Sequence, residues 1–222
     1  MPRTSVSYFV TTCLLFFSLI AGKVMAADAD KPAVSFTQGK HYQVLAEPLP
    51  EGVAAVTEFF YFGCRSCYQL APVIAEWSQT TGIPVGMVPA HAETAMADAA
   101  RLYHTFAQMG VLGQMYELGY VMFQTDEVKL QGKARIDSYL DRHNVDKEVF
   151  WATWSSPAVE QRLAGSLMLT KMAKITKTPT FVVHGRYVVD LEALESVEQL
   201  FELLEHLVKE KQPQAPALIQ KL

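Results

Sequence analysis

The chain has 222 residues, of which 50% are apolar and 19% are charged, and this composition excludes an intrinsically disordered protein and a collagen-like fibre. Its length suits one domain with a substantial core, or one domain that carries an insertion. The net charge is −4, from 19 basic and 23 acidic residues, so the chain offers no positive field for phosphate groups. Nucleic acid is therefore not expected as a partner.

The first 26 residues have the pattern of a secretory signal peptide. Arg3 supplies the positive start, residues 8–21 are apolar and uncharged, and Val24 and Ala26 stand at positions −3 and −1 of a cleavage site. The apolar stretch is shorter than the roughly 20 residues that a membrane-spanning helix needs. We expect cleavage near Ala26 and export to an oxidising compartment, and a retained N-terminal anchor is the alternative.

The mature chain then holds two cysteines, Cys64 and Cys67, because Cys13 leaves with the signal peptide. A purely structural disulfide explains this pair poorly, since closing so short a loop removes little entropy from the unfolded chain. A zinc site explains it poorly as well, because there is no second cysteine pair. The six histidines are scattered along the chain, at His41, His91, His104, His143, His184 and His206. The pair therefore favours redox chemistry, with metal binding or delivery through the two thiolates as the alternative of a different class.

The residues around the two cysteines predict that they lie at the start of a helix. Residues 56–62 are mostly β-branched or aromatic, which predicts a strand, and apolar residues after Cys67 recur at helical spacing as far as Gly82. Because free N–H groups and the dipole at a helix N-terminus stabilise a thiolate, Cys64 is predicted to be the nucleophile. Cys67, one turn further on, is predicted to be more buried and to act as the resolving cysteine.

The remaining chain predicts a sheet interrupted by helices. Further strands are expected at 42–45, 83–88, 180–183 and 186–189, the last two joined by a two-residue turn at His184 and Gly185. Residues 93–175 show helical spacing without a convincing strand, which predicts four or more helices, one of them capped by Asn144. Ser196 opens a C-terminal helix with a capping-box pattern. The strand, helix, strand order places the cysteines at the C-terminal end of a parallel strand.

Two segments resemble a known family. The segment from Glu58 to Leu70, with its Phe-Phe pair, its Cys pair and the following Tyr-Gln, resembles the active-site segment of the DsbA family of periplasmic thiol:disulfide oxidoreductases. The segment from Thr178 to Tyr187 is similar to the cis-proline loop of that family and the hairpin after it. The resemblance implies an α/β, thioredoxin-like fold with an inserted helical domain. The expected parts are a signal peptide at 1–26, a thioredoxin-like domain at 27–92 and 176–212, a helical insertion at 93–175, and a tail at 213–222.

The resemblance also implies residues that assist the cysteines. Pro179 is expected to have a cis peptide bond beside them, and Thr178 to offer its backbone to an extended substrate. Glu58, an acid in an apolar strand, matches the buried acid of the family and is a candidate proton acceptor for Cys67. The alternative is a carboxylate that faces solvent. His91 could also approach the site, although a hydrogen-bonded loop histidine is the favoured interpretation.

Between the cysteines, Arg65 and Ser66 replace the Pro-His of the family. Arg65 brings a permanent cation and Ser66 a hydroxyl donor, and both favour the thiolate of Cys64. These two residues are therefore expected to tune the pKa of the nucleophile and, with it, the redox potential.

We accordingly expect a periplasmic enzyme that introduces disulfide bonds into reduced exported proteins through a redox-active Cys64–Cys67 disulfide. The resemblance implies a membrane reoxidase of the DsbB type as partner. We expect a monomer with no cofactor and no metal. The alternatives are a disulfide reductase or isomerase, and a thiolate metal-binding or delivery protein.

Overall fold

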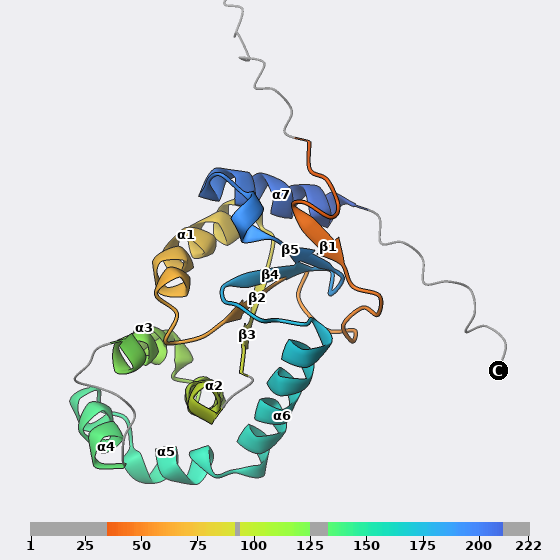
Figure 1. Cartoon of the computed structure of the whole chain (residues 1–222). Helices are drawn as coiled ribbons and strands as arrows, with labels where there is room; N and C mark the ends of the chain where they lie inside the picture. The colour runs from red at the N-terminus through yellow and green to blue at the C-terminus, as the bar shows by residue number, and fades with distance from the viewer. Residues whose placement is uncertain (1–34, 92–93, 125–132, 211–222) are drawn as a thin grey trace, which may run out of the picture. The chain divides into compact units, whose positions relative to one another are not determined.

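A computed structural model of the chain describes residues 35–91, 94–124 and 133–210 (Figure 1). The predicted signal peptide at 1–26 and the tail at 213–222 lie outside these residues. None of the helices in the described ranges is both long enough and apolar enough to cross a membrane.

The five strands form one mixed sheet in the order β1-β5-β4-β2-β3. They span Tyr42–Val44 (β1), Val56–Phe60 (β2), Val85–Pro89 (β3), Thr180–Val183 (β4) and Tyr187–Val189 (β5). β2 and β3 are parallel, with Val56 opposite Val85, and the other three pairings are antiparallel. All five residues of β2 are buried, which agrees with its inner place in the sheet.

Helices cover both faces of this sheet. α1 (Arg65–Thr81) connects β2 to β3 and lies with α7 (Val197–Lys209) over one face, where both contribute to a core cluster with Val56, Phe181 and Val183 (Figure 1). The end of α6 (Pro157–Met172) packs on the other face against Phe59 and Val88. A short 3-10 helix, η2 (Leu191–Ala193), stands between β5 and α7.

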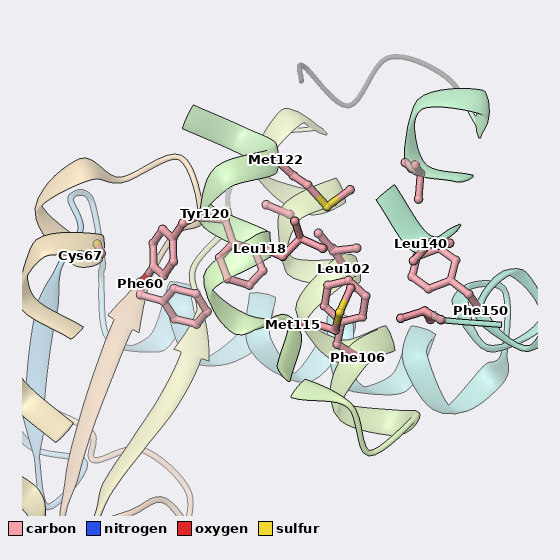
Figure 2. Close-up of a cluster of buried hydrophobic side chains, with 14 residues drawn as sticks. Phe60, Cys67, Leu102, Phe106, Met115, Leu118, Tyr120, Met122, Leu140 and Phe150 are labelled. Atoms are coloured by element: carbon pink, nitrogen blue, oxygen red, sulfur yellow. The ribbon is translucent and has the colours of Figure 1, made fainter. Parts of the chain in front are cut away.

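In the described ranges, a block of helices is inserted between β3 and β4. It consists of α2 (Thr94–Gln108), α3 (Leu112–Gln124), α4 (Lys133–Arg142), α5 (Lys147–Trp154) and α6. Its core is continuous with the active-site strand, because Phe60, Phe62 and Cys67 belong to the same buried cluster as Leu102, Phe106 and Met115 (Figure 2). The predicted α/β fold with a helical insertion is confirmed.

α3 approaches the end of β2 closely. A side-chain carbon added at Gly119 would stand 2.4 Å from Cζ of Phe62, so the Phe62 ring packs directly on the α3 backbone. This contact brings the insertion against the segment that carries the cysteines.

The structure corrects some local predictions. β2 ends at Phe60 rather than at residue 62, because the chain turns there and the Cys64 N–H donates to the Tyr61 carbonyl at 2.8 Å. Asp146, not Asn144, caps α5, since its carboxylate accepts from the N–H groups of the first turn. Asn144 instead has a left-handed backbone with φ of 54° after the end of α4.

The hairpin between β4 and β5 turns at His184 and Gly185 as predicted. Their φ angles are 51° and 63°, which a tight turn between antiparallel strands requires. β5 begins one residue later than predicted, because the Arg186 N–H closes the turn onto the Val183 carbonyl at 2.9 Å.

Candidate active site

Cys64 is the N-cap of α1, whereas Cys67 lies within the first turn of that helix. Its sulfur accepts a hydrogen bond from the Cys67 N–H at 3.1 Å, one of the free donors of the first helical turn. The two sulfurs form a disulfide with an S–S distance of 2.16 Å. Cys64 is partly exposed, whereas Cys67 is 0% exposed. An attacking thiolate therefore reaches Cys64 and not Cys67.

The loop before β4 lies against the Cys64 sulfur. The carbonyl oxygen of Thr178 is 3.3 Å from Sγ of Cys64, and the Thr178–Pro179 peptide bond is cis. The Thr180 hydroxyl donates to the Lys177 carbonyl at 2.8 Å and so closes this loop on itself. The backbone of Thr178 thus lies directly beside the Cys64 sulfur.

The two residues between the cysteines differ in their relation to the sulfur. The Ser66 hydroxyl lies 3.4 Å from Sγ of Cys64, within reach for a hydrogen bond to sulfur. Arg65 is exposed to solvent, where its charge is screened. The Ser66 hydroxyl is therefore in contact with the Cys64 sulfur.

Gln124, at the end of α3, also supports the active-site turn. Its side-chain amide donates to the carbonyl oxygens of Phe62 at 3.1 Å and Cys64 at 3.2 Å. Gln124 lies 60 positions from Cys64 and no local pattern marks it, so its role could not be predicted from the sequence. Only the docking of the insertion on the sheet brings it there.

Glu58 lies at the centre of β2 and is 1% exposed, so it is not a solvent-facing carboxylate. It shares a sheet face with Val56 and Phe60, because side chains alternate along a strand. Those neighbours pack against α1, and Phe60 belongs to the cluster that contains Cys67. Burial raises the pKa of the Glu58 carboxyl from 4.5 to about 7, a value that suits proton exchange near neutral pH.

A cavity of about 550 Å³ opens beside the disulfide. Its lining comes from α1, the loop before β4, and the segment around η2 and the start of α7, and includes Ser66, Val73, Thr178, Pro179, Leu194 and Val197. Val73 and Val197 are exposed apolar side chains. The cavity can therefore receive an apolar side chain of a polypeptide held at Cys64.

His91 is a hydrogen-bonded histidine at the end of β3, as favoured above. It is 5% exposed, and its Nε2 lies 3.0 Å from the Leu163 carbonyl. In the described part of the chain, no group of three or more His, Cys, Asp or Glu side chains is arranged to hold a metal ion.

Comparison with known proteins agrees with this geometry. The family model of the DSBA-like thioredoxin domain matches residues 68–202, which is more than half of the chain. The chain belongs to the DSBA-like thioredoxin domain family. The matched range begins just after Cys67 and includes the helical insertion, the loop at Pro179 and the first part of α7.

Relatives within the DsbA family match over most of their length. The thiol:disulfide interchange protein DsbA of Pseudomonas aeruginosa is 28% identical, and the match covers 93% of this chain and 97% of the relative. DsbA of Burkholderia cepacia is also 28% identical, with 91% and 96% covered. A crystal structure of P. aeruginosa DsbA has a TM-score of 0.70 and 27% identity, and covers 78% of this chain and 93% of that one.

Proposed function

We propose that this protein is a periplasmic thiol:disulfide oxidoreductase that introduces disulfide bonds into exported proteins. The observation that carries the proposal is the asymmetric disulfide at the start of α1. Cys64 caps the helix, is partly exposed and lies beside the Thr178 carbonyl, while Cys67 is buried. The DsbA relatives, which are named thiol:disulfide interchange proteins, support the same reaction.

The proposed reaction transfers two electrons from a substrate dithiol to the enzyme. A substrate thiolate attacks Sγ of Cys64, the Cys64–Cys67 bond breaks, and Cys67 leaves as a thiolate that takes up a proton. A second substrate thiolate then attacks the substrate sulfur of the mixed disulfide and releases Cys64 as a thiolate. Glu58, whose pKa of about 7 leaves it partly protonated at neutral pH, supplies this proton to Cys67 and is the proton acceptor for Cys67 when the disulfide forms again.

The geometry supports oxidation as the favoured direction. The start of α1, the Cys67 N–H and the Ser66 hydroxyl all stabilise negative charge on Cys64. A stabilised thiolate favours the reduced enzyme, which makes its disulfide a stronger oxidant. Cys64 is therefore the nucleophile and leaving group, Cys67 the resolving cysteine, and Arg65 and Ser66 the residues that tune the Cys64 thiol.

The substrate is an extended segment of a reduced polypeptide. It pairs with the backbone of Thr178 next to Pro179 and places an apolar side chain in the cavity beside Val73 and Val197. A cysteine-to-serine variant of Proteus mirabilis DsbA was solved in complex with the non-covalently bound peptide PWATCDS, at a TM-score of 0.68 and 17% identity, covering 80% of this chain and 100% of that one.

The signal-peptide pattern at residues 1–26 supports export to the periplasm, with cleavage near Ala26. The family relationship supports a membrane reoxidase of the DsbB type, which restores the Cys64–Cys67 disulfide after each turnover. The enzyme acts as a monomer in this proposal.

The experiment mixes the oxidised mature protein with a reduced peptide that carries two cysteines, and counts free thiols on both partners. We expect one disulfide to be lost from the protein for each one gained by the peptide, and Cys64→Ser to abolish the transfer. A protein that transfers no disulfide but retains stoichiometric zinc or copper through dialysis would instead support the metal-binding alternative.

A further inference from the structure

A pair of tyrosines on α3, one buried and one partly buried, lies between the insertion and the active-site strand. Tyr116 and Tyr120 are one turn apart on α3, and their hydroxyl oxygens are 3.1 Å from each other. Tyr120 is 1% exposed, and its ring lies 5.1 Å from the ring of Tyr68, the residue after Cys67. Figure 2 shows Phe60 and Tyr120 on the side of the buried cluster that faces Cys67. The pair thus adjoins the redox site without touching the sulfurs.

The same pair faces the part of β2 that carries Glu58. The ring of Phe60, two residues along the strand on the same face, lies 6.0 Å from the Tyr116 ring and 6.3 Å from the Tyr120 ring. Among the described residues, Oε1 of Glu58 is buried without a hydrogen-bond partner. A buried carboxylate oxygen in that state needs a donor as soon as the group ionises.

The groups around Glu58 limit which residue can donate a hydrogen bond to its carboxylate. Its cross-strand neighbours, Met87 and Phe181, do not titrate and have no side-chain donor. The titratable groups that its charge reaches are Tyr116 and Tyr120 of α3, while Tyr103 of α2 interacts with the same two tyrosines. Cys67 of α1 belongs to the buried cluster that contains Phe60.

Both phenols of the pair remain protonated at every physiological pH. Burial is the main cause that raises the pKa of Tyr116 and of Tyr120, and the charge of Glu58 raises both further. Either hydroxyl can be the donor in their mutual hydrogen bond. Because the two hydroxyls carry two hydrogens, the Tyr120 hydrogen is left for another acceptor whenever Tyr116 donates to the Tyr120 oxygen.

We propose that the Tyr116–Tyr120 pair positions Glu58 for proton exchange, with the Tyr120 hydroxyl donating to the Glu58 carboxylate once Glu58 has passed its proton to Cys67. Tyr116 acts through Tyr120, because its own hydrogen holds the Tyr120 oxygen in place. This inference rests on the proposed function, in which Glu58 exchanges a proton with Cys67. It adds a positioning role for two residues of the insertion and gives the insertion a part in the chemistry.

The test measures the pKa of the Glu58 carboxyl in the reduced protein by ¹³C NMR with labelled glutamate, where Glu58→Gln identifies the signal. Removing a donor from a carboxylate disfavours the ionised form, so Tyr120→Phe should raise this pKa by about one pH unit. Tyr116→Phe should raise it by less. The pH profile for closing of the Cys64–Cys67 disulfide after reaction with oxidised glutathione should move by the same amount, with its high-pH rate unchanged.

Tyr139→Phe is the matched control, because it removes a tyrosine hydroxyl from α4, where the Tyr139 ring packs against Arg142. It should leave both the carboxyl pKa and the pH profile of the parent unchanged. An unshifted Glu58 pKa in both Tyr120→Phe and Tyr116→Phe would overturn the positioning role, even if the parent exchanges disulfides normally. Failure of the proposed function is separate, since the parent would then form no mixed disulfide at all.

Discussion

Cys64 and Cys67 are three residues apart, yet α1 gives their sulfurs different surroundings. Because Cys64 is partly exposed at the helix start and Cys67 is 0% exposed, reagents reach Cys64 first. In the reduced protein, alkylation at mildly acidic pH should label Cys64 before Cys67, as peptide mapping will show. Cys67→Ser should accumulate mixed disulfides with substrate. Labelling that begins at Cys67 would refute the assigned roles.

Glu58 is expected to make stability depend on pH. Its carboxyl pKa is about 7 in the folded protein against an ordinary value of 4.5, so the folded state binds more protons between these values. Stability therefore falls as the pH rises through this window, by about 3 kcal/mol in total. Glu58→Gln removes that loss, so at pH 8 it should be more stable than the parent by up to about 3 kcal/mol, relative to their difference at pH 4.

Denaturant unfolding of the oxidised proteins at both pH values measures this difference. Glu51→Gln, at an exposed carboxylate in the loop before β2, is a control that should show no comparable change. A difference between parent and Glu58→Gln that stays constant from pH 4 to pH 8 would show that Glu58 is ionised with an ordinary pKa.

Ser66 and Arg65 are expected to stabilise the Cys64 thiolate to different degrees. The Ser66 hydroxyl lies 3.4 Å from the sulfur, whereas the Arg65 side chain is exposed and its charge is screened by solvent. Titration of thiolate absorbance should place the Cys64 pKa well below that of a free thiol. Ser66→Ala should raise it more than Arg65→Ala. The opposite order would assign the main effect to the guanidinium charge.

At the scale of elements, α3 connects the insertion to the redox site through the contact of Gly119 with Phe62. A Cβ at this position would stand 2.4 Å from the Phe62 ring, so Gly119→Ala must displace α3 or the ring. Overpacking of this kind costs about 1–3 kcal/mol. Gly119→Ala should therefore lower the unfolding free energy by that amount and slow disulfide exchange.

Gly113 provides the control on the same helix, since an added Cβ there meets nothing within 4 Å. Gly113→Ala should be neutral or stabilise the protein, by up to about 1 kcal/mol, because alanine favours a helix. Equal effects of the two substitutions on unfolding would mean that the close approach of α3 to Phe62 does not matter.

The elements that the sequence predicts best are those defined by local patterns. The strand before Cys64, the helix after it and the turn at Gly185 each follow from neighbouring residues. The choice of Asp146 over Asn144 as a cap depends on where α4 ends, which the local pattern does not define. Local patterns also do not identify the α3 residues near the site, because these residues meet it only through the packing of α3. They are Tyr116, Tyr120 and Gln124.

At the scale of the whole molecule, the fold combines a redox centre on the sheet with an insertion that supports it from the side. Gln124 holds the turn that leads to Cys64, and the core of the insertion includes Cys67. The residues proposed to stabilise the Cys64 thiolate, in contrast, all belong to the start of α1. In the proposed function, that helix start therefore sets the direction of exchange, and the contact with the insertion supports proton exchange.

The most direct test of the proposed function equilibrates the purified mature protein with glutathione redox buffers. The quantity measured is the ratio of reduced to oxidised Cys64–Cys67 at each buffer potential. A stabilised Cys64 thiolate predicts a potential clearly above the value of about −270 mV of cytosolic thioredoxin. A potential at or below that value, together with a Cys64 pKa close to that of a free thiol, would contradict the oxidase function and indicate a reductase.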